Sequence, residues 1–490
     1  MTSNIAARRP TTRIPRPTAQ PAAIRSTQRA LAAAALLALA LLPLTATHAR
    51  AQDTTSRRDS LASRVDQLER ATDSLRLLVE QQTQRLMDLD ARTAAATPAP
   101  GADTSRRVLS SSSGIYGKPF VHRFGAGTAV GGYIDLEYTN AIDAHESALD
   151  QHRFIPFIYS EITDRLHVGA EMEFEHGARV EVEDGEAEGG GEVRVEFATI
   201  DYRLSEGFNV RGGLVLAPLG RFNLIHDSPI NDLTDRPLVD QDLIPTTLAE
   251  PAFGAFGTLY PSARSVLTYE LYVTNGFSPR VVSDEGIRTH DAIAVGEEDV
   301  PFARSLVGRV AFSPFLGLEV GLSAHHGPFA RAGLTQTFAS LVSDDSVTAA
   351  FTGDERLDIG ALDLSIQHGP FELMGEGGLL HADLPAVLRS AGFGTRQAGF
   401  YLQGNYHFGF GWLAPRATSA FTAVVRYGFV DLDRDRRGAD ESRLSLGFNW
   451  RPIPDAAFKA DYQWNWSRDL GATARNPQDR RVRVSMATYF

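Results

Sequence analysis

The stretch RLHVGAEMEFEH, residues 165–176, decides the fold. Its apolar residues alternate with polar or small ones, which is the two-residue period of a β-strand whose two faces meet different surroundings. Such a strand has water on one side and an apolar medium on the other. The apolar face carries Leu166, Val168, Ala170, Met172 and Phe174, and the opposite face carries His167, Gly169, Glu171, Glu173 and Glu175.

The same alternation recurs from about Gly127 to the C-terminus, as in QAGFYLQGNYHF (397–408) and RLSLGFNW (443–450). Most of these segments reach the roughly 9–11 residues that a tilted strand needs to cross a bilayer. Sixteen of them can be marked, an even number: 127–139, 153–162, 165–176, 192–204, 207–217, 252–260, 264–274, 303–313, 317–326, 356–367, 370–380, 396–409, 418–432, 442–451, 456–466 and 480–490.

The lengths of the connections alternate as well. Those after odd-numbered segments span 13, 15, 34, 28, 29, 15, 9 and 13 residues, and those after even-numbered segments span 2, 2, 3, 3, 2, 8 and 4. Outer-membrane barrels have this asymmetry, because their periplasmic turns are tight and their outer loops are long. A sheet in hydrocarbon must also close, since no backbone group can stay unpaired there. The sequence therefore predicts an all-β fold, a 16-stranded antiparallel transmembrane β-barrel over residues 127–490, preceded by a short N-terminal coiled-coil helix.

Composition excludes other classes. A hydrophobic content of 43% is too high for a disordered chain, and the absence of cysteine excludes a disulfide scaffold and a Cys-type zinc site. The formal net charge of −12 argues against a nucleic-acid partner, which would require a basic surface.

The N-terminal residues have the features of an export signal. Residues 1–29 contain six arginines and no acid, an apolar run follows over 30–46, and Ala49-Arg50-Ala51 offers a cleavage site. We therefore predict a signal peptide over 1–51. A membrane anchor is the alternative, but the run is short for a span and contains Pro43.

Residues 52–92 predict a periplasmic coiled-coil helix. Apolar residues there are spaced alternately by four and three, the pattern of a seam between helices. A single amphipathic helix lying on its own protein is the alternative. The Pro-, Ala- and Ser-rich residues 93–126 predict a flexible linker. The apolar seam positions are Leu61, Val65, Leu68, Leu75, Val79, Leu86 and Leu89.

Four stretches resemble the phosphate-selective porin O and P family: GGYIDLEYT (131–139), LVLAPLGRFNLIHDSPINDLTDRPLV (214–239), VVRYGFVDLD (424–433) and LSLGFNWRPIPDAAFKADYQW (444–464). The resemblance implies an outer-membrane porin that acts as a homotrimer. Its partners would be outer-membrane lipid and the small hydrophilic solutes or ions that diffuse through it. It also implies a constriction built from loops that fold inward.

The loop 218–251 is the candidate constriction, because a connection of this length in a compact protein needs a purpose. An external cap over the barrel is the alternative. The constriction candidates are Arg221, His226, Asp227, Asp232, Asp235, Arg236 and Glu250.

The predicted inner wall mixes acids and bases. Phosphate-selective relatives are expected to attract anions with lysines and arginines, but this chain has two lysines, Lys118 and Lys459. Since rings of charged side chains set the field that an ion meets, we expect a weak cation preference or little preference. The wall candidates are the acids Asp135, Glu137, Glu171 and Glu173 and the bases Arg211, Arg309, Arg426 and Arg451.

Enzymatic signatures are weak. His226-Asp227 could form a base with its orienting acid and His325-His326 a metal pair, but such histidines are more often solvated or bonded to neighbours. The sequence has no GxSxG, HExxH or P-loop motif. We predict no enzymatic activity, no cofactor and no metal site. The rival function is a non-conducting barrel that serves as a surface anchor or adhesin, closed by the loops 275–302 and 327–355.

Overall fold

The structure is a computed structural model that describes residues 122–124, 127–178, 181–183, 186–188, 191–277, 281–283, 286–289, 305–329, 354–413 and 419–490. The predicted signal peptide, coiled coil and most of the linker lie outside these residues and stay predictions.

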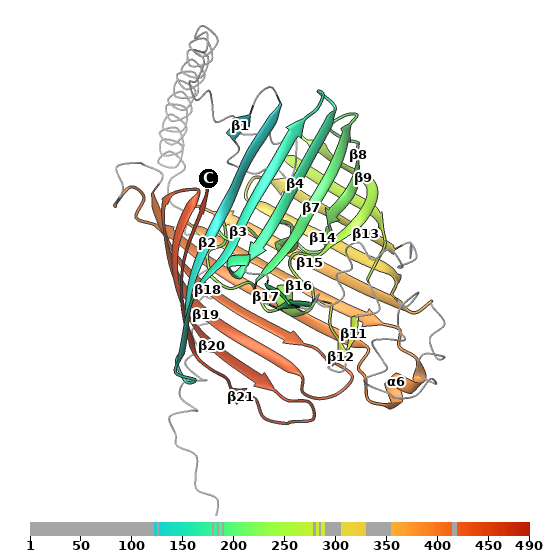
Figure 1. Cartoon of the computed structure of the whole chain (residues 1–490), viewed down its shortest axis with the longest axis vertical. Helices are drawn as coiled ribbons and strands as arrows, with labels where there is room; N and C mark the ends of the chain where they lie inside the picture. The colour runs from blue at the N-terminus through green and yellow to red at the C-terminus, as the bar shows by residue number, and fades with distance from the viewer. Residues whose placement is uncertain are drawn as a thin grey trace, which may run out of the picture. The chain divides into compact units, whose positions relative to one another are not determined.

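Sixteen long strands form one closed antiparallel barrel. Each pairs with its successor along the chain, and β22 pairs back with β2, with Tyr489 opposite Tyr133. Figure 1 shows neighbouring strands side by side and tilted, from β2 in teal to β20 in red. The strands are β2 (Thr128–Ala141), β3 (Glu146–Glu161), β4 (Leu166–Glu175), β7 (Glu192–Arg203), β8 (Asn209–Leu216), β9 (Ala249–Ser262), β10 (Ser265–Thr274), β13 (Ser305–Phe315), β14 (Leu318–Pro328), β15 (Arg356–His368), β16 (Phe371–Ala382), β17 (Arg396–Phe408), β18 (Ala420–Asp431), β19 (Asp440–Ile453), β20 (Ala456–Arg468) and β22 (Arg481–Tyr489).

Each of the sixteen predicted segments overlaps one of these strands, so the predicted barrel fold is confirmed. No helix of the described residues is long and apolar enough to cross a membrane. Several smaller elements accompany the sixteen strands. They are β1 (His122–Phe124), which pairs with β2; the hairpins β5 (Glu181–Glu183) with β6 (Glu186–Glu188) and β11 (Val282–Ser283) with β12 (Gly286–Ile287); β21 (Asn476–Pro477), which pairs with β20; and the short helices η2 (His176–Ala178), η3 (Phe222–Leu224), α3 (Val239–Asp242) and α6 (Ala386–Ser390).

The two faces of the barrel differ as the alternation predicts. Outward side chains are apolar and exposed, for example Leu322 at 64% and Leu362 at 57%, whereas the inward Glu171 and Glu173 are fully buried. The outer surface is therefore suited to hydrocarbon, and the polar groups are sequestered inside.

Most connections are long at one end of the barrel and short at the other, although 409–419 at the second end is longer than 432–439 at the first. We call these the long-connection end and the short-connection end. The first connection corrects the prediction, because residues 142–145 form a short turn in place of a 13-residue loop. The reason is that β3 begins at Glu146 and pairs with the end of β2, with Glu146 opposite Ala141.

Aromatic side chains form an outer girdle near the short-connection end. Phe421 stacks on Phe448 with ring centroids 5.3 Å apart, and Trp450 stacks on Phe458 at the same distance. Aromatic rings of this kind suit the boundary between hydrocarbon and water.

The last residue completes the closure of the barrel. The Phe490 backbone N–H donates to the Gly132 carbonyl at 2.9 Å, and its ring stacks on Phe154 at 5.9 Å between centroids. A Cβ at Gly132 would lie 2.5 Å from the Phe490 ring and 2.5 Å from the Ile155 carbonyl oxygen. Only a residue without a side chain fits at this position.

We therefore expect Gly132→Val to destabilise the barrel by about 1–3 kcal/mol, because the backbone of β3 cannot yield to the added side chain. The fraction of protein that migrates as a folded barrel on unheated electrophoresis should fall. Gly360→Val is the matched control, since a Cβ at Gly360 has no atom within 4 Å. Equal folded fractions for the two variants would contradict this role of Gly132.

Candidate functional site

Residues 217–248, which connect β8 to β9, are called the inner segment. They extend across the inside of the barrel and bond to side chains of β14, β16, β17, β18, β19, β20 and β22. The prediction placed this connection at 218–251. Residues 249–251 instead belong to β9, where Glu250 pairs with Val215 of β8, so Glu250 is a wall residue and not a loop residue.

The base of the inner segment is closed by Asn223. Its side-chain amide donates to the carbonyls of Ala217 and Leu248 at 2.8 and 3.1 Å, and its oxygen accepts the Leu248 N–H at 3.0 Å. One buried side chain thus ties the beginning and the end of the segment together.

Four inward glycines on consecutive strands, here called the glycine strip, receive apolar side chains of the inner segment. A Cβ at Gly447 would lie 2.1 Å from Leu233, and one at Gly399 would lie 3.1 Å from Val239. The wall lacks side chains where the segment packs against it. The pairs are Gly378 of β16 with Leu243 and Ile244, Gly399 of β17 with Val239, Gly428 of β18 with Leu238, and Gly447 of β19 with Leu233.

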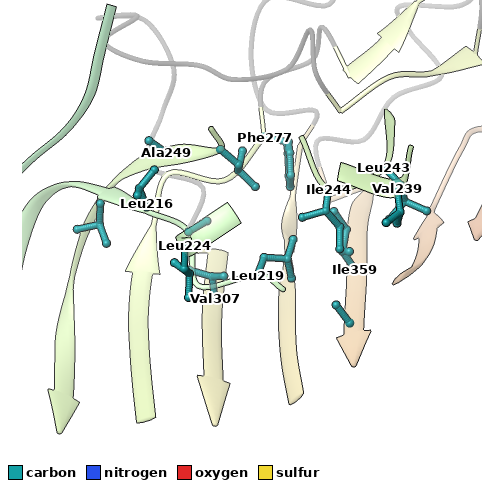
Figure 2. Close-up of a cluster of buried hydrophobic side chains, with 14 of the residues drawn as sticks. Leu216, Leu219, Leu224, Val239, Leu243, Ile244, Ala249, Phe277, Val307 and Ile359 are labelled. Atoms are coloured by element: carbon teal, nitrogen blue, oxygen red, sulfur yellow. The ribbon is translucent and has the colours of Figure 1, made fainter. Parts of the chain in front are cut away.

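A hydrophobic cluster joins the inner segment to the wall. Figure 2 shows segment residues such as Leu224 and Ile244 gathered with Val307 of β13 and Ile359 of β15. Each of these four side chains is at most 4% exposed. The burial of this apolar surface favours the inward position of the segment.

Asp232 anchors the inner segment to two strands. Its Oδ2 accepts the Asn405 amide of β17 at 2.7 Å, and its Oδ1 accepts Asn449 and Arg451 of β19, each at 3.2 Å. A buried carboxylate is tolerated when donors surround it in this way.

Asp235 is the second anchor. Its carboxylate lies 3.0 Å from Arg443 of β19 and 2.9 Å from Arg483 of β22, and it accepts the Gln463 amide at 3.0 Å. Burial would raise the pKa of Asp235, but Arg483 and Arg443 outweigh burial and lower it below its usual value. Asp235 therefore stays ionised and neutralises part of the charge of two arginines.

Carboxyl groups also meet at the start of the inner segment. Glu376 of β16 accepts the backbone N–H groups of Arg221 and Phe222 at 2.7 and 3.0 Å. A Cβ at Gly220 would lie 1.8 Å from this carboxylate, so the approach requires glycine. Burial and the nearby Glu376 raise the pKa of Asp240 well above its usual value.

Basic wall residues hold carbonyl groups of the inner segment. Arg451 donates to Pro229, Ile230 and Asn231, and Arg426 donates to the Asp235 carbonyl at 2.7 Å. Lys459, which the sequence analysis did not propose for the site, donates to the Ser228 carbonyl at 2.9 Å. These cations therefore position the segment.

The remaining constriction candidates have separate partners. His226 Nε2 lies 3.3 Å from Glu196 of β7, and Asp227 accepts the Tyr489 hydroxyl at 2.6 Å. Arg236 donates to the Thr246 carbonyl at 2.8 Å, which stabilises the segment itself. His226 and Asp227 thus bond to different residues, which gives no support for a paired base and acid.

Arg221 differs from these because its guanidinium is partly exposed. Its Nε lies 3.8 Å from Glu319 of β14. Arg221 also lines the cavity beside the inner segment.

The wall candidates all lie on the inner face. Arg211 forms two bonds of 2.6 Å with Asp201, and Arg309 donates to Asp363 at 2.7 and 3.2 Å. Glu173 binds Arg153 at 3.0 Å. Glu137 lies 3.3 Å from Arg483, and Asp135 and Glu171 are both fully buried.

A cavity of about 390 Å³ lies between the inner segment and the wall. It reaches toward the short-connection end, where Pro454 lies in the turn between β19 and β20. Its polar lining includes Arg221, Asp232, Glu372, Gln403, His407, Arg426 and Arg451.

His325 and His326 face opposite sides of β14. His325 is buried with its Nε2 3.3 Å from Glu250, whereas His326 is exposed outside and bonds to Asp358. They therefore do not form a metal pair. The sequence analysis missed the glycine strip, although the signal was present: all four glycines fall on the polar phase of their strands.

No family model matches the chain. A protein of Aquifex aeolicus described as uncharacterized is 27% identical over 369 residues, which cover 70% of this chain and 76% of that protein. Among solved structures, the anion-selective porin from Comamonas acidovorans has 13% identity and a TM-score of 0.44, with 74% of this chain and 99% of that chain covered. The outer membrane channel DcaP of Acinetobacter baumannii has 11% identity and a TM-score of 0.46, with coverage of 75% and 99%. Likeness at this level identifies no solute or assembly for this chain.

If the glycine strip seats the inner segment, Gly447→Phe should displace it, because the added ring would occupy the position of Leu233. Overpacking should destabilise the docked position of the segment by about 1–3 kcal/mol. We therefore expect the backbone amides of residues 231–236 to exchange roughly tenfold faster, as measured by hydrogen–deuterium exchange. The control Gly360→Phe places the same ring on the outer face of β15 and should leave the exchange unchanged. Unaltered exchange in a folded Gly447→Phe barrel would show that the strip is not the seat.

Proposed function

We propose that the chain is an outer-membrane porin through which small hydrophilic solutes or ions diffuse passively, narrowed by the inner segment. The observation that carries this proposal is the inner segment itself, which crosses a closed barrel and bonds to the far wall through Asp232 and Asp235. A sixteen-stranded barrel is wide enough for an aqueous channel, and an inward segment reduces its bore.

The outer surface supports the location in a membrane. Exposed apolar side chains cover the outside, and the aromatic girdle containing Trp450 and Phe458 marks one boundary. Because every barrel strand is paired on both sides, hydrocarbon would meet no open sheet edge. Long connections at one end and short turns at the other match the outer and periplasmic ends of bacterial barrels.

The charge of the interior supports a weak preference for cations. Among the described residues, sixteen acids and five bases are buried, not counting histidines. Half-buried arginines such as Arg443, Arg451 and Arg483 add positive charge inside but do not offset this excess. Bases such as Arg211 and Arg309 are already paired with Asp201 and Asp363. An anion would therefore meet an excess of acids, with Arg221 as a partly exposed base in the cavity, and this balance argues against phosphate selectivity.

Planar-bilayer recording of the purified, folded protein tests the proposal. We expect stable stepwise increases in current as single channels open. In a salt gradient, we expect a reversal potential that indicates a weak preference for cations. The rival non-conducting anchor or adhesin predicts negligible conductance. A folded barrel that stays silent, also after Gly447→Phe displaces the segment, would overturn the porin assignment.

Asp235→Asn should shift selectivity toward anions, because Arg443 and Arg483 lose their shared counter-charge. We expect the cation-to-anion permeability ratio to fall about twofold, measured from reversal potentials in a KCl gradient. Asp143→Asn removes the same charge from an exposed turn, where Asp143 pairs with Arg480. Salt screens that distant turn, so this control should keep the wild-type ratio.

A further inference from the structure

Three metal-binding side chains meet at the long-connection end of the barrel. Asp150 Oδ2 lies 3.1 Å from His152 Nδ1 and 2.7 Å from His176 Nδ1. One ligand atom from each of the three residues falls within 4.8 Å of the others. Asp150 and His152 are partly buried, and His176 is accessible from solvent.

The backbone brings these residues together in two ways. The pairing of β2 with β3 shifts register between Asp135 and Glu137, so that Glu137 is opposite Asp150. A bulge of this kind re-aims a side chain, and His152 here lies on the side of both Asp150 and Glu137. After β4, His176 adopts a left-handed φ of 52°, and its ring meets the His152 ring with centroids 5.2 Å apart.

We propose that Asp150, His152 and His176 form a binding site for a borderline divalent cation such as Zn²⁺. Two imidazoles and one carboxylate are ligands that suit zinc, nickel and copper, whereas calcium and magnesium prefer oxygen ligands alone. Three protein ligands leave positions open for water, as in zinc sites that exchange their remaining ligand.

A carboxylate lies behind one of the proposed ligands. His152 Nε2 is 3.9 Å from Glu137 Oε1, so the ring has its Nδ1 toward Asp150 and its other nitrogen toward Glu137. Carboxylates behind metal-ligating histidines orient the ring and raise its basicity. His152 thus has the surroundings of a metal ligand.

The local charge also favours a cation. Arg153, the nearest strong base in the sequence, is engaged by Glu173 and Glu175 at 3.0 and 2.8 Å. The stretch EVEDGEAEGGGE (181–192), which follows His176 closely in the chain, adds six acids. The nearest base is thus already neutralised by two acids, which reduces the repulsion that a divalent cation would meet at the site.

Titration calorimetry of the full folded protein in detergent tests the site with ZnCl₂ and, separately, CaCl₂. We expect one equivalent of Zn²⁺ to bind and CaCl₂ to give no saturable heat. The double variant His152→Gln with His176→Gln should lose at least about tenfold in Zn²⁺ affinity. His167→Gln, which changes a histidine near the short-connection end of β4, should bind as the wild type does.

The two histidines could instead only donate hydrogen bonds to Asp150. In that case Zn²⁺ would not bind to the wild type, or would bind equally to the double variant, and either result overturns the proposal. Folding of each variant is checked by electrophoretic migration without heating. If the double variant does not fold, X-ray absorption of the zinc-loaded wild type decides, because the site requires two imidazole ligands. None of these measurements depends on conduction, so the site and the porin function can fail separately.

Discussion

The rest of the structure depends on one constraint: every backbone N–H and C=O of the sheet needs a partner, and in the proposed membrane location hydrocarbon would offer none. A flat sheet would leave two edges, each unpaired group costing several kcal/mol. The first and last long strands must therefore meet, and β22 pairs with β2 over Tyr133–Ala141 and Arg481–Tyr489. The Phe490 backbone continues this pairing beyond the last strand. With closure fixed, alternate residues of every strand face inward, and the chemistry of the interior follows from that arrangement.

The interior is organised by shape as well as by charge. The glycine strip provides room for the apolar side chains of the inner segment, and Asp232 and Asp235 hold that segment through amide and guanidinium donors. Most wall arginines bind a carboxylate or a carbonyl, so their main contribution is to hold the structure together.

The two-residue period was sufficient to predict the strands and the face on which each side chain lies. Glu171, Arg211 and Arg426 all lie inside the barrel and are buried. The prediction was wrong where the sequence carries no clear turn signal. The turn before β3 holds a left-handed His145 in place of a glycine, so the sequence showed no break there and the strand began seven residues later in the prediction. For the same reason Asp150 and His152 were assigned to a connection.

The contacts between side chains on opposite sides of the barrel could not be predicted from the sequence. The bonds of Asp232 to Asn405 and of Asp235 to Arg483 depend on strand tilt and stagger, which no local pattern encodes. The predicted boundaries of the inner segment were also slightly too late at its end, because the pairing of β9 with β8 extends to Ala249. Alternation reveals which residues share a face, and only the closed ring reveals which of them meet.

The location of the glycine strip has a consequence for the order of assembly. The inner segment is synthesised between the fifth and sixth barrel strands, but its seat belongs to β16, β17, β18 and β19, which emerge much later. Thr234, for instance, bonds to Asp461, 227 residues further along the chain. Such distant contacts form late, because the long intervening chain must first be ordered. The contacts of the inner segment with these strands can therefore form only after the C-terminal half of the ring has been synthesised, so the segment cannot be seated while the first half of the barrel is being made.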